Sequence, residues 1–212
     1  MNLIIFGPQG SGKGTQADLL AEKFKLVHLE TGQIFREIAR EKTELGATIL
    51  ELNNRKEMIP DEITVEVIEN YLKKIPTESG VILDSAPRTL GQIAPVEEMM
   101  QKMGRKIDKA IYITLPREES VARITKRYAC TLCYRHFVLG KDIQSANDAC
   151  PTCSGPIQQR GDDTPDGIAK RLKTFYEITM PVIEQYRQRK MLIEVDGNQS
   201  VEKVFAEIID KL

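Results

Sequence analysis

Residues 3–15 of the chain read Leu-Ile-Ile-Phe-Gly-Pro-Gln-Gly-Ser-Gly-Lys-Gly-Thr. A short apolar run, as in a buried strand, leads directly into a loop with four glycines, and Lys13 opens a stretch of helical periodicity. Such a loop folds into a nest of inward-pointing N–H groups, to which the helix N-terminus adds partial positive charge. Lys13 would then reach the β- and γ-phosphates of a nucleotide. The stretch therefore predicts a strand, a phosphate-binding loop and a helix, in preference to a simple glycine-rich turn with an exposed lysine.

Beyond this stretch, apolar runs alternate with helical patterns in the order expected of a parallel sheet covered by helices. The runs are short and partly β-branched, as strands buried on both faces are. Strands are predicted at 3–6, 26–29, 81–84, 109–115 and 191–195. Helices are predicted at 13–23, 34–40, 61–73, 90–103, 117–127, 165–187 and 201–212. Pro181 is expected to kink the helix at 165–187, because proline removes a backbone donor.

Two stretches interrupt this alternation. Residues 31–59 contain two helical patterns without a strand between them, which indicates a small helical insertion. Residues 128–164 have no helical period and contain all four cysteines of the chain, which indicates a separate small module.

Composition limits the classes of function. A chain of 212 residues with 41% hydrophobic residues fits one α/β unit with small insertions. The net charge of −1 does not favour nonspecific binding to nucleic acid or membranes, so a site for polyanions must come from locally clustered arginines. The first apolar run is too short for a signal peptide and no run approaches a membrane span, so a cytoplasmic location is expected.

The cysteines form two Cys-x-x-Cys pairs, Cys130 with Cys133 and Cys150 with Cys153, separated by 16 residues. Two such pairs on facing turns are typical of a structural zinc site with four sulfur ligands. An iron–sulfur centre could use the same ligands, and a redox dithiol would need only one pair. A catalytic zinc is disfavoured because four cysteines leave no open position.

The loop departs from the common phosphate-loop pattern in having Gly14 directly after the lysine, with Thr15 next. In this it resembles adenylate kinases and related nucleoside monophosphate kinases, and the resemblance extends along essentially the whole chain. The segments that carry it are Glu30-Thr31-Gly32-Gln33 with Arg36, Met58-Ile59-Pro60-Asp61, Asp84-Ser85-Ala86-Pro87-Arg88-Thr89 with Gln92, Arg123 with Arg127, Arg160 with Asp162-Asp163, Arg171, and Val195-Asp196-Gly197.

The resemblance implies a P-loop kinase of the α/β class, with a five-stranded parallel sheet flanked by helices. It divides the chain into a core (1–29, 60–127 and 164–212), a helical insertion that binds the nucleoside monophosphate (30–59) and a zinc-ribbon-like lid (128–163). The implied reaction is reversible phosphoryl transfer from ATP·Mg to AMP, giving two ADP. A monomer is the default expectation, with neither nucleic acid nor membrane as partner.

The resemblance also implies roles for particular residues. The residues expected around the transferred phosphoryl group are Lys13, Arg88, Arg123, Arg160 and Arg171. Those expected to bind ATP are Gly10, Ser11, Gly12, Lys13, Gly14, Thr15, Arg123, Arg127, His136, Phe137 and Gln199. Those expected to bind AMP are Thr31, Gly32, Arg36, Glu57, Met58, Ile59, Ser85, Arg88, Gln92, Arg160 and Arg171. Asp84 is expected to hold a water on Mg²⁺, and the four cysteines to hold Zn²⁺.

Some expectations keep an alternative beside them. Gln92 either reads the acceptor base, as the resemblance favours, or completes a capping box that begins at Thr89. Arg123 and Arg127 are expected on one face of the helix at 117–127, where a charged surface would also explain them. Ser85-Ala86 stands where the family has Gly-Phe, which is expected to soften selectivity for AMP.

The donor side shows no comparable base reader in the sequence, so other nucleoside triphosphates are expected to replace ATP. The alternative functions are a kinase for another monophosphate (UMP, CMP or dAMP) and an inactive nucleotide-binding zinc-ribbon protein. Thr31 and Gln92 argue against the first alternative, and the neutral net charge and the arginine set argue against the second.

Overall fold

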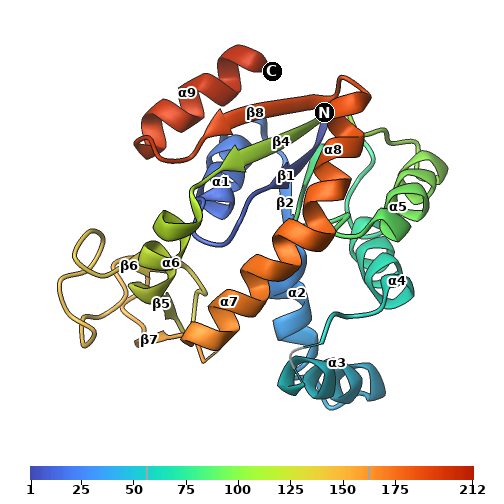
Figure 1. The fold of residues 1–212 in the computed structure, drawn as a ribbon. Helices are drawn as coiled ribbons and strands as arrows, with labels where there is room; N and C mark the ends of the chain where they lie inside the picture. The colour runs from blue at the N-terminus through green and yellow to red at the C-terminus, as the bar shows by residue number, and fades with distance from the viewer. Residues whose placement is uncertain (56, 162) are drawn as a thin grey trace.

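The computed structural model describes residues 1–55, 57–161 and 163–212 of the chain, and Figure 1 shows their arrangement around one central sheet. Its strands are β1 (Asn2–Phe6), β2 (Val27–Glu30), β3 (Val81–Asp84), β4 (Lys109–Thr114) and β8 (Leu192–Asp196). They lie parallel in the order β2-β3-β1-β4-β8, with β1 in the middle. The five-stranded parallel sheet predicted from the sequence is confirmed, with strand ends that differ by no more than one residue from the prediction.

The side chains of the central strand alternate between the two faces of the sheet. Ile4 and Phe6 of β1 belong to one buried cluster, and Leu3 and Ile5 belong to the other. The first cluster is completed by α4 (Asp61–Leu72), α5 (Leu90–Lys102) and α8 (Met180–Gln188), the second by α1 (Lys13–Phe24) and α9 (Val201–Lys211). Since full burial of such a side chain contributes about 1.5–3 kcal/mol, the two layers hold β1 and the loop that follows it in a fixed position.

The helical insertion consists of α2 (Thr31–Ile38) and α3 (Glu44–Asn54). α2 begins directly after β2, three residues earlier than predicted, and ends at Ile38 rather than at residue 40. Ile34 and Ile38 anchor α2 in the first buried cluster, while the Thr43 hydroxyl caps α3 by accepting a hydrogen bond from the backbone N–H of Gly46.

The cysteine-bearing segment follows α6 (Arg117–Thr125) and forms a small sheet of its own. Strands β5 (Arg127–Cys130), β6 (His136–Val138) and β7 (Ile157–Gln159) pair antiparallel in the order β6-β5-β7. Here the prediction for residues 117–127 is wrong at its end. α6 stops at Thr125, and Arg127 is the first residue of β5, so Arg123 and Arg127 do not share a helix face.

The predicted helix at 165–187 is divided into α7 (Pro165–Thr174), a π-helical turn η1 (Phe175–Thr179) and α8. Pro181 lies in the first turn of α8. Because proline has no N–H and its ring crowds the carbonyl four residues before it, the wider turn at η1 accommodates it. The expected break is thus present, immediately before the proline.

Within the part of the chain that is described, no helix combines the length and the apolar character needed to cross a membrane.

Candidate active site

The phosphate loop lies between β1 and α1, at the carboxyl edge of the sheet. Gly10 and Gly12 have φ angles of 81° and 87°, in the left-handed region that glycine adopts without strain. Gly7 is needed for a different reason, since a Cβ atom there would lie 2.3 Å from the Ser11 hydroxyl oxygen and 2.9 Å from the Ile113 carbonyl oxygen. The loop is therefore a tight cradle that ends at Gly12, the residue that caps α1, and Lys13 follows as the first residue of the helix.

Arg123 reaches across the rim of this loop from α6. Its Nη1 atom donates to the carbonyl oxygens of Gly197, at 3.1 Å, and of Gly10, at 3.3 Å. Its Nη2 atom lies 3.4 Å from Oδ1 of Asn198. These contacts fix a permanent positive charge beside the loop.

Asp84 ends β3 next to the loop and is almost completely buried. It accepts a hydrogen bond of 2.8 Å from the hydroxyl of Ser85, and its Oδ2 atom lies 3.5 Å from Nε2 of His28. Burial acts to raise the pKa of Asp84, but the charge of Lys13 and the contacts with His28 and Ser85 outweigh it and hold the pKa below its ordinary value. Asp84 is therefore a carboxylate at neutral pH, which suits a ligand for the hydration shell of a cation.

His28 was not singled out in the sequence, although its ring lies between two acids. Nδ1 lies 2.8 Å from Oδ1 of Asp18, and Nε2 faces Asp84. Burial acts to lower the pKa of His28, but Asp18 and Asp84 together raise it to about 9. His28 is thus a cation at neutral pH, and its ring lies next to the carboxylate of Asp84. A lone histidine in a strand gives no spacing signal, so only the fold reveals this arrangement.

We expect His28 to stabilise the folded chain in a pH-dependent way. Because the folded pKa is about 9 and the ordinary value is 6.5, the contribution should be complete below pH 6.5 and lost as the pH rises through 9. Urea unfolding near neutral pH should show His28→Gln to be less stable than the parent chain by about 1–3 kcal/mol, with the difference shrinking toward pH 10. The difference in unfolding free energy between His28 and His28→Gln should be smaller when both chains carry Asp18→Asn. A stability gap that does not change with pH would contradict this assignment.

At the end of the site where the sequence places AMP, the first turn of α2 lies against the end of β3. The Thr31 hydroxyl donates to the Asp84 carbonyl oxygen at 3.0 Å. Ser85, which replaces glycine in the resemblance, has a φ of 66° and so adopts the conformation in which glycine is favoured. Arg36 of α2 faces this region and is paired with Glu30, whose Oε1 atom lies 2.9 Å from its Nη2 atom.

Gln92 is engaged at both ends of its side-chain amide. Its Oε1 accepts from the backbone N–H of Arg88 at 2.7 Å, and its Nε2 donates to Oδ1 of Asp61 at 2.8 Å. Its own backbone N–H donates to the hydroxyl of Thr89, which caps α5. Thr89 thus caps the helix as the capping alternative expects, but the Gln92 side chain bonds to the N–H of Arg88 rather than to that of Thr89. Its contact with a base remains a prediction.

The arginines near the lid converge on Asp163, whose side chain is fully buried. Arg127 forms a double contact with it, Nε to Oδ2 at 2.9 Å and Nη2 to Oδ1 at 2.6 Å, and Nη2 of Arg171 lies 2.5 Å from Oδ1. Burial and the positive charges of Arg160 and Arg171 lower the pKa of Arg127, although Asp163 acts in the opposite direction. Arg127 and Arg171 thus share the buried carboxylate of Asp163 at the edge of the cavity. Asp162, expected beside Asp163, lies outside the described residues.

The lid also touches the helical insertion. The Nη1 atom of Arg40 lies 2.5 Å from the Tyr134 hydroxyl, and its guanidinium carbon lies 5.0 Å from the centre of the Tyr134 ring. No sequence pattern indicated this pair, whose members are 94 residues apart. The contact joins the segment next to Cys133 to the insertion.

A single cavity of about 1790 Å³ runs from the phosphate loop to the first turn of α2. One drug-sized ligand occupies a pocket of roughly 300–1,000 Å³, so this cavity has room for two nucleotides. Every residue that the sequence assigned to ATP, AMP, magnesium or the transferred phosphoryl group lines it. Arginines reach it from the insertion, the core and the lid.

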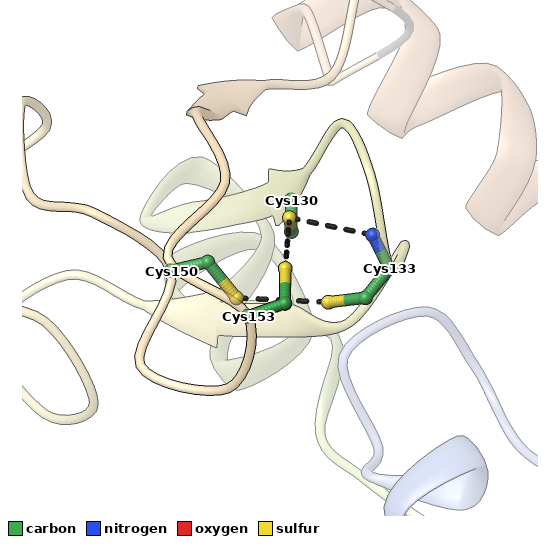
Figure 2. Close-up of side chains that lie close together, drawn as sticks. All are labelled: Cys130, Cys133, Cys150 and Cys153. Carbon is green, nitrogen blue, oxygen red and sulfur yellow. Dashed lines mark hydrogen bonds between the residues drawn. The ribbon is translucent and has the colours of Figure 1, made fainter.

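The four cysteine sulfurs form a compact group in the lid, as Figure 2 shows. All four Sγ atoms lie within 4.8 Å of one another, with 3.5 Å between Cys130 and Cys153 and 3.6 Å between Cys133 and Cys150. A tetrahedral zinc ion with Zn–S bonds of about 2.3 Å would separate its sulfurs by about 3.8 Å. The donor set and its spacing therefore fit a closed four-sulfur metal site without rearrangement of the backbone.

Comparisons with known proteins agree with this geometry. The family model described as adenylate kinase matches residues 5–191. The adenylate kinase of Fervidobacterium nodosum is 39% identical over 204 residues, which cover 96% of this chain and 94% of the relative. The adenylate kinase of Dehalococcoides mccartyi is 37% identical over 211 residues, which cover 100% of this chain and 97% of the relative. The adenylate kinase of Archaeoglobus fulgidus is 37% identical over 208 residues, which cover 98% and 96%.

Proposed function

This chain belongs to the adenylate kinase family, and on that premise we propose how its residues divide the work of phosphoryl transfer. The chain is a phosphotransferase that catalyses the reversible reaction of ATP and AMP to two ADP. The observation that carries the assignment of residues is the single cavity, which is lined by the phosphate loop at one end and by Thr31, Arg36 and Arg88 at the other.

The reaction needs one bond to form and one to break. An oxygen of the AMP phosphate attacks the γ-phosphorus of ATP, and the bond from that phosphorus to the β–γ bridging oxygen breaks, so that ADP leaves and the acceptor becomes ADP. The protein supplies little covalent chemistry here, since the transition state is loose and spreads its charge over the phosphoryl oxygens. Its contribution is position and positive charge.

Donor and acceptor are held by different groups. Lys13 and the loop amides bind the β- and γ-phosphates of ATP, with Arg123 beside them and Arg127 toward the lid. Arg36 and Arg88 bind the acceptor phosphate, because a guanidinium grips phosphate oxygens through two parallel hydrogen bonds. Arg160 and Arg171 lie on the side of the lid and complete the set of positive charges around the transferred phosphoryl group. Magnesium bound to the phosphates would neutralise part of their charge, with Asp84 holding its water.

The three parts of the chain fit this division. We assign residues 1–29, 60–126 and 164–212 to the core, residues 30–59 to the acceptor-binding insertion and residues 127–163 to the lid, one residue earlier than predicted, because Arg127 begins the lid strand β5. Closure of the lid over the insertion would exclude water, which otherwise competes with AMP for the phosphoryl group. The contact between Arg40 and Tyr134 supports this closing movement.

Zinc is the metal we propose for the four cysteines, in a structural role. Four thiolates leave no open position for catalysis, and the antiparallel strands around them have only the small buried cluster of Cys130, Phe137, Ile143, Cys150 and Ile157. A core of that size supplies little stability by itself, and a structural metal is one of the ways in which small modules are stabilised. We further propose a cytoplasmic monomer whose only partners are the nucleotides.

We expect the donor site to tolerate bases other than adenine. Arg123, near the donor end, is engaged by backbone carbonyls, and Nε2 of Gln199 donates to Oε2 of Glu207 at 2.8 Å and to the Asp196 carbonyl oxygen at 3.2 Å. Phe137 is buried in the lid cluster, so of the two predicted rings it is His136 on which a base would stack, and stacking accepts any base because each base has a π-face. GTP, CTP and UTP should therefore give kcat/KM values within roughly tenfold of ATP, or about 1.4 kcal/mol.

This experiment also tests the division of the site. The four triphosphates are varied at saturating AMP, and AMP, GMP, CMP and UMP are then varied at saturating ATP. AMP should be preferred over the other monophosphates by more than ATP is preferred over the other triphosphates, since a site built to hydrogen-bond one base rejects the others strongly. A preference for ATP above about a hundredfold, or 2.7 kcal/mol, would mean that a donor-base reader exists in the protein.

A further inference from the structure

Glu30 places a negative charge inside the acceptor end of the cavity, a position that the proposed function does not use. It is the residue that precedes α2, yet its side chain makes no capping hydrogen bond to the start of the helix. The carboxylate turns instead to Arg36, with Oε1 lying 2.9 Å from Nη2. Both residues line the cavity, and both side chains keep about a third of their surface exposed, at 28% for Glu30 and 33% for Arg36.

The side chains of Glu30 and Arg36 pack against the first turn of α2, next to Gly32. A Cβ atom on Gly32 would come within 3.3 Å of Nη1 of Arg36 and 3.8 Å of Oε1 of Glu30. The charge of Glu30 also reaches the lid, where it raises the pKa of His136 against the stronger lowering effects of burial and of Arg127 and Arg160. Glu30 and His136 therefore face the same cavity from the insertion and from the lid.

A carboxylate and a phosphate bind arginine in the same way, through oxygens that accept from the planar guanidinium fork. Both cannot occupy the same donors of Arg36 at once. They also repel each other, and that repulsion is stronger in a partly desolvated cavity than in water.

We propose that Glu30 is a built-in competitor for the acceptor phosphate, which occupies Arg36 until a monophosphate displaces it and so sets the affinity of the acceptor site. The inference rests on the proposed role of Arg36 as a ligand of that phosphate. A nucleotide displaces the carboxylate because its base and ribose contribute further contacts. A free inorganic anion has only the phosphate contact, so it displaces the carboxylate with nothing to offset the loss of the ion pair.

The test measures four ligands on the full-length protein with Glu30→Gln and, as a second variant, Glu30→Ser. The KM of AMP and the Ki of inorganic phosphate against AMP should both fall by the same factor, on the order of three- to tenfold, as expected for loss of a partly exposed ion pair and its repulsion. The Ki of adenosine, which has no phosphate, and the KM of ATP should not change. Glu51→Gln is the matched control, because it removes a carboxylate of the same insertion from an exposed pair with Arg55.

A double-mutant cycle with Arg36→Gln separates the inference from the function on which it rests. Arg36→Gln should raise the KM of AMP, and Glu30→Gln should lower it by a smaller factor in that background than in the parent chain, because only the direct repulsion of the phosphate is then removed. If Arg36→Gln raises the KM of AMP but Glu30→Gln leaves it unchanged or raises it, Glu30 does not compete and the inference is wrong. If Arg36→Gln leaves the KM of AMP unchanged, the assignment of Arg36 is wrong, and the inference with it.

Discussion

Replacement of Lys13 by alanine should reduce turnover by about two to three orders of magnitude, because a preorganised cation beside the transferred phosphate contributes that much. Lys13 is the first residue of α1, lines the cavity and acts electrostatically on Asp84. The fold should survive, since Asp84 keeps its contacts with His28 and Ser85 and the two buried layers are untouched.

Lys23→Ala is the matched control for this experiment. Lys23 lies in the last turn of the same helix, exposed and away from the cavity, with its amine 5.9 Å from the centre of the Phe24 ring. Initial rates with ATP and AMP should be close to those of the parent chain for Lys23→Ala and nearly absent for Lys13→Ala. Near-normal turnover by folded Lys13→Ala protein would show that the loop is not the donor site.

Removal of the zinc proposed for the four cysteines should lower the stability of the chain more than the other changes considered above. Zinc binding in isolated fingers provides about 10–16 kcal/mol, and a lid attached to a folded core should depend on it less. We expect a strong chelator, or Cys130→Ala, to lower the Tm by roughly 5–15 °C. The parallel sheet should remain folded, because its two clusters contain no cysteine.

Elemental analysis of the purified chain supports this measurement and should find about one zinc per chain. Thr152→Ala, an exposed change between Cys150 and Cys153 that keeps all four sulfurs, should leave both the metal content and the Tm unchanged. An active preparation without metal would contradict the structural role, and one with iron would favour the iron–sulfur alternative.

Most of the sheet could be predicted because its signals are local. Residues 81–84 form an apolar run that ends with Asp84, and β3 has the same bounds. The predicted bounds of helices are wrong where contacts with other parts of the chain determine where the helix begins or ends. α2 starts at Thr31 without a turn after β2, and Arg127 belongs to β5 because it pairs with Val138 across the lid sheet. The helical pattern around Arg127 carries no information about pairing with a strand residue that lies 11 residues further along the chain.

The site was predictable only in part, for a related reason. Motif residues such as Lys13 and Asp84 are identified by what stands next to them in the chain. The roles of His28 and Glu30 depend instead on which side chains the fold brings to them. Asp84 reaches His28 only through the pairing of β2 with β3, and the turn from β2 into α2 brings Glu30 to Arg36.

The transfer of the γ-phosphate of ATP to AMP can be followed directly with a radioactive label. The purified chain is incubated with magnesium, AMP and ATP that carries a radioactive γ-phosphate, and the products are separated. We expect the label to appear in ADP, with very little in inorganic phosphate, because closure of the lid would exclude water. Label that accumulates as inorganic phosphate, or that remains in ATP while AMP is unchanged, would contradict this expectation.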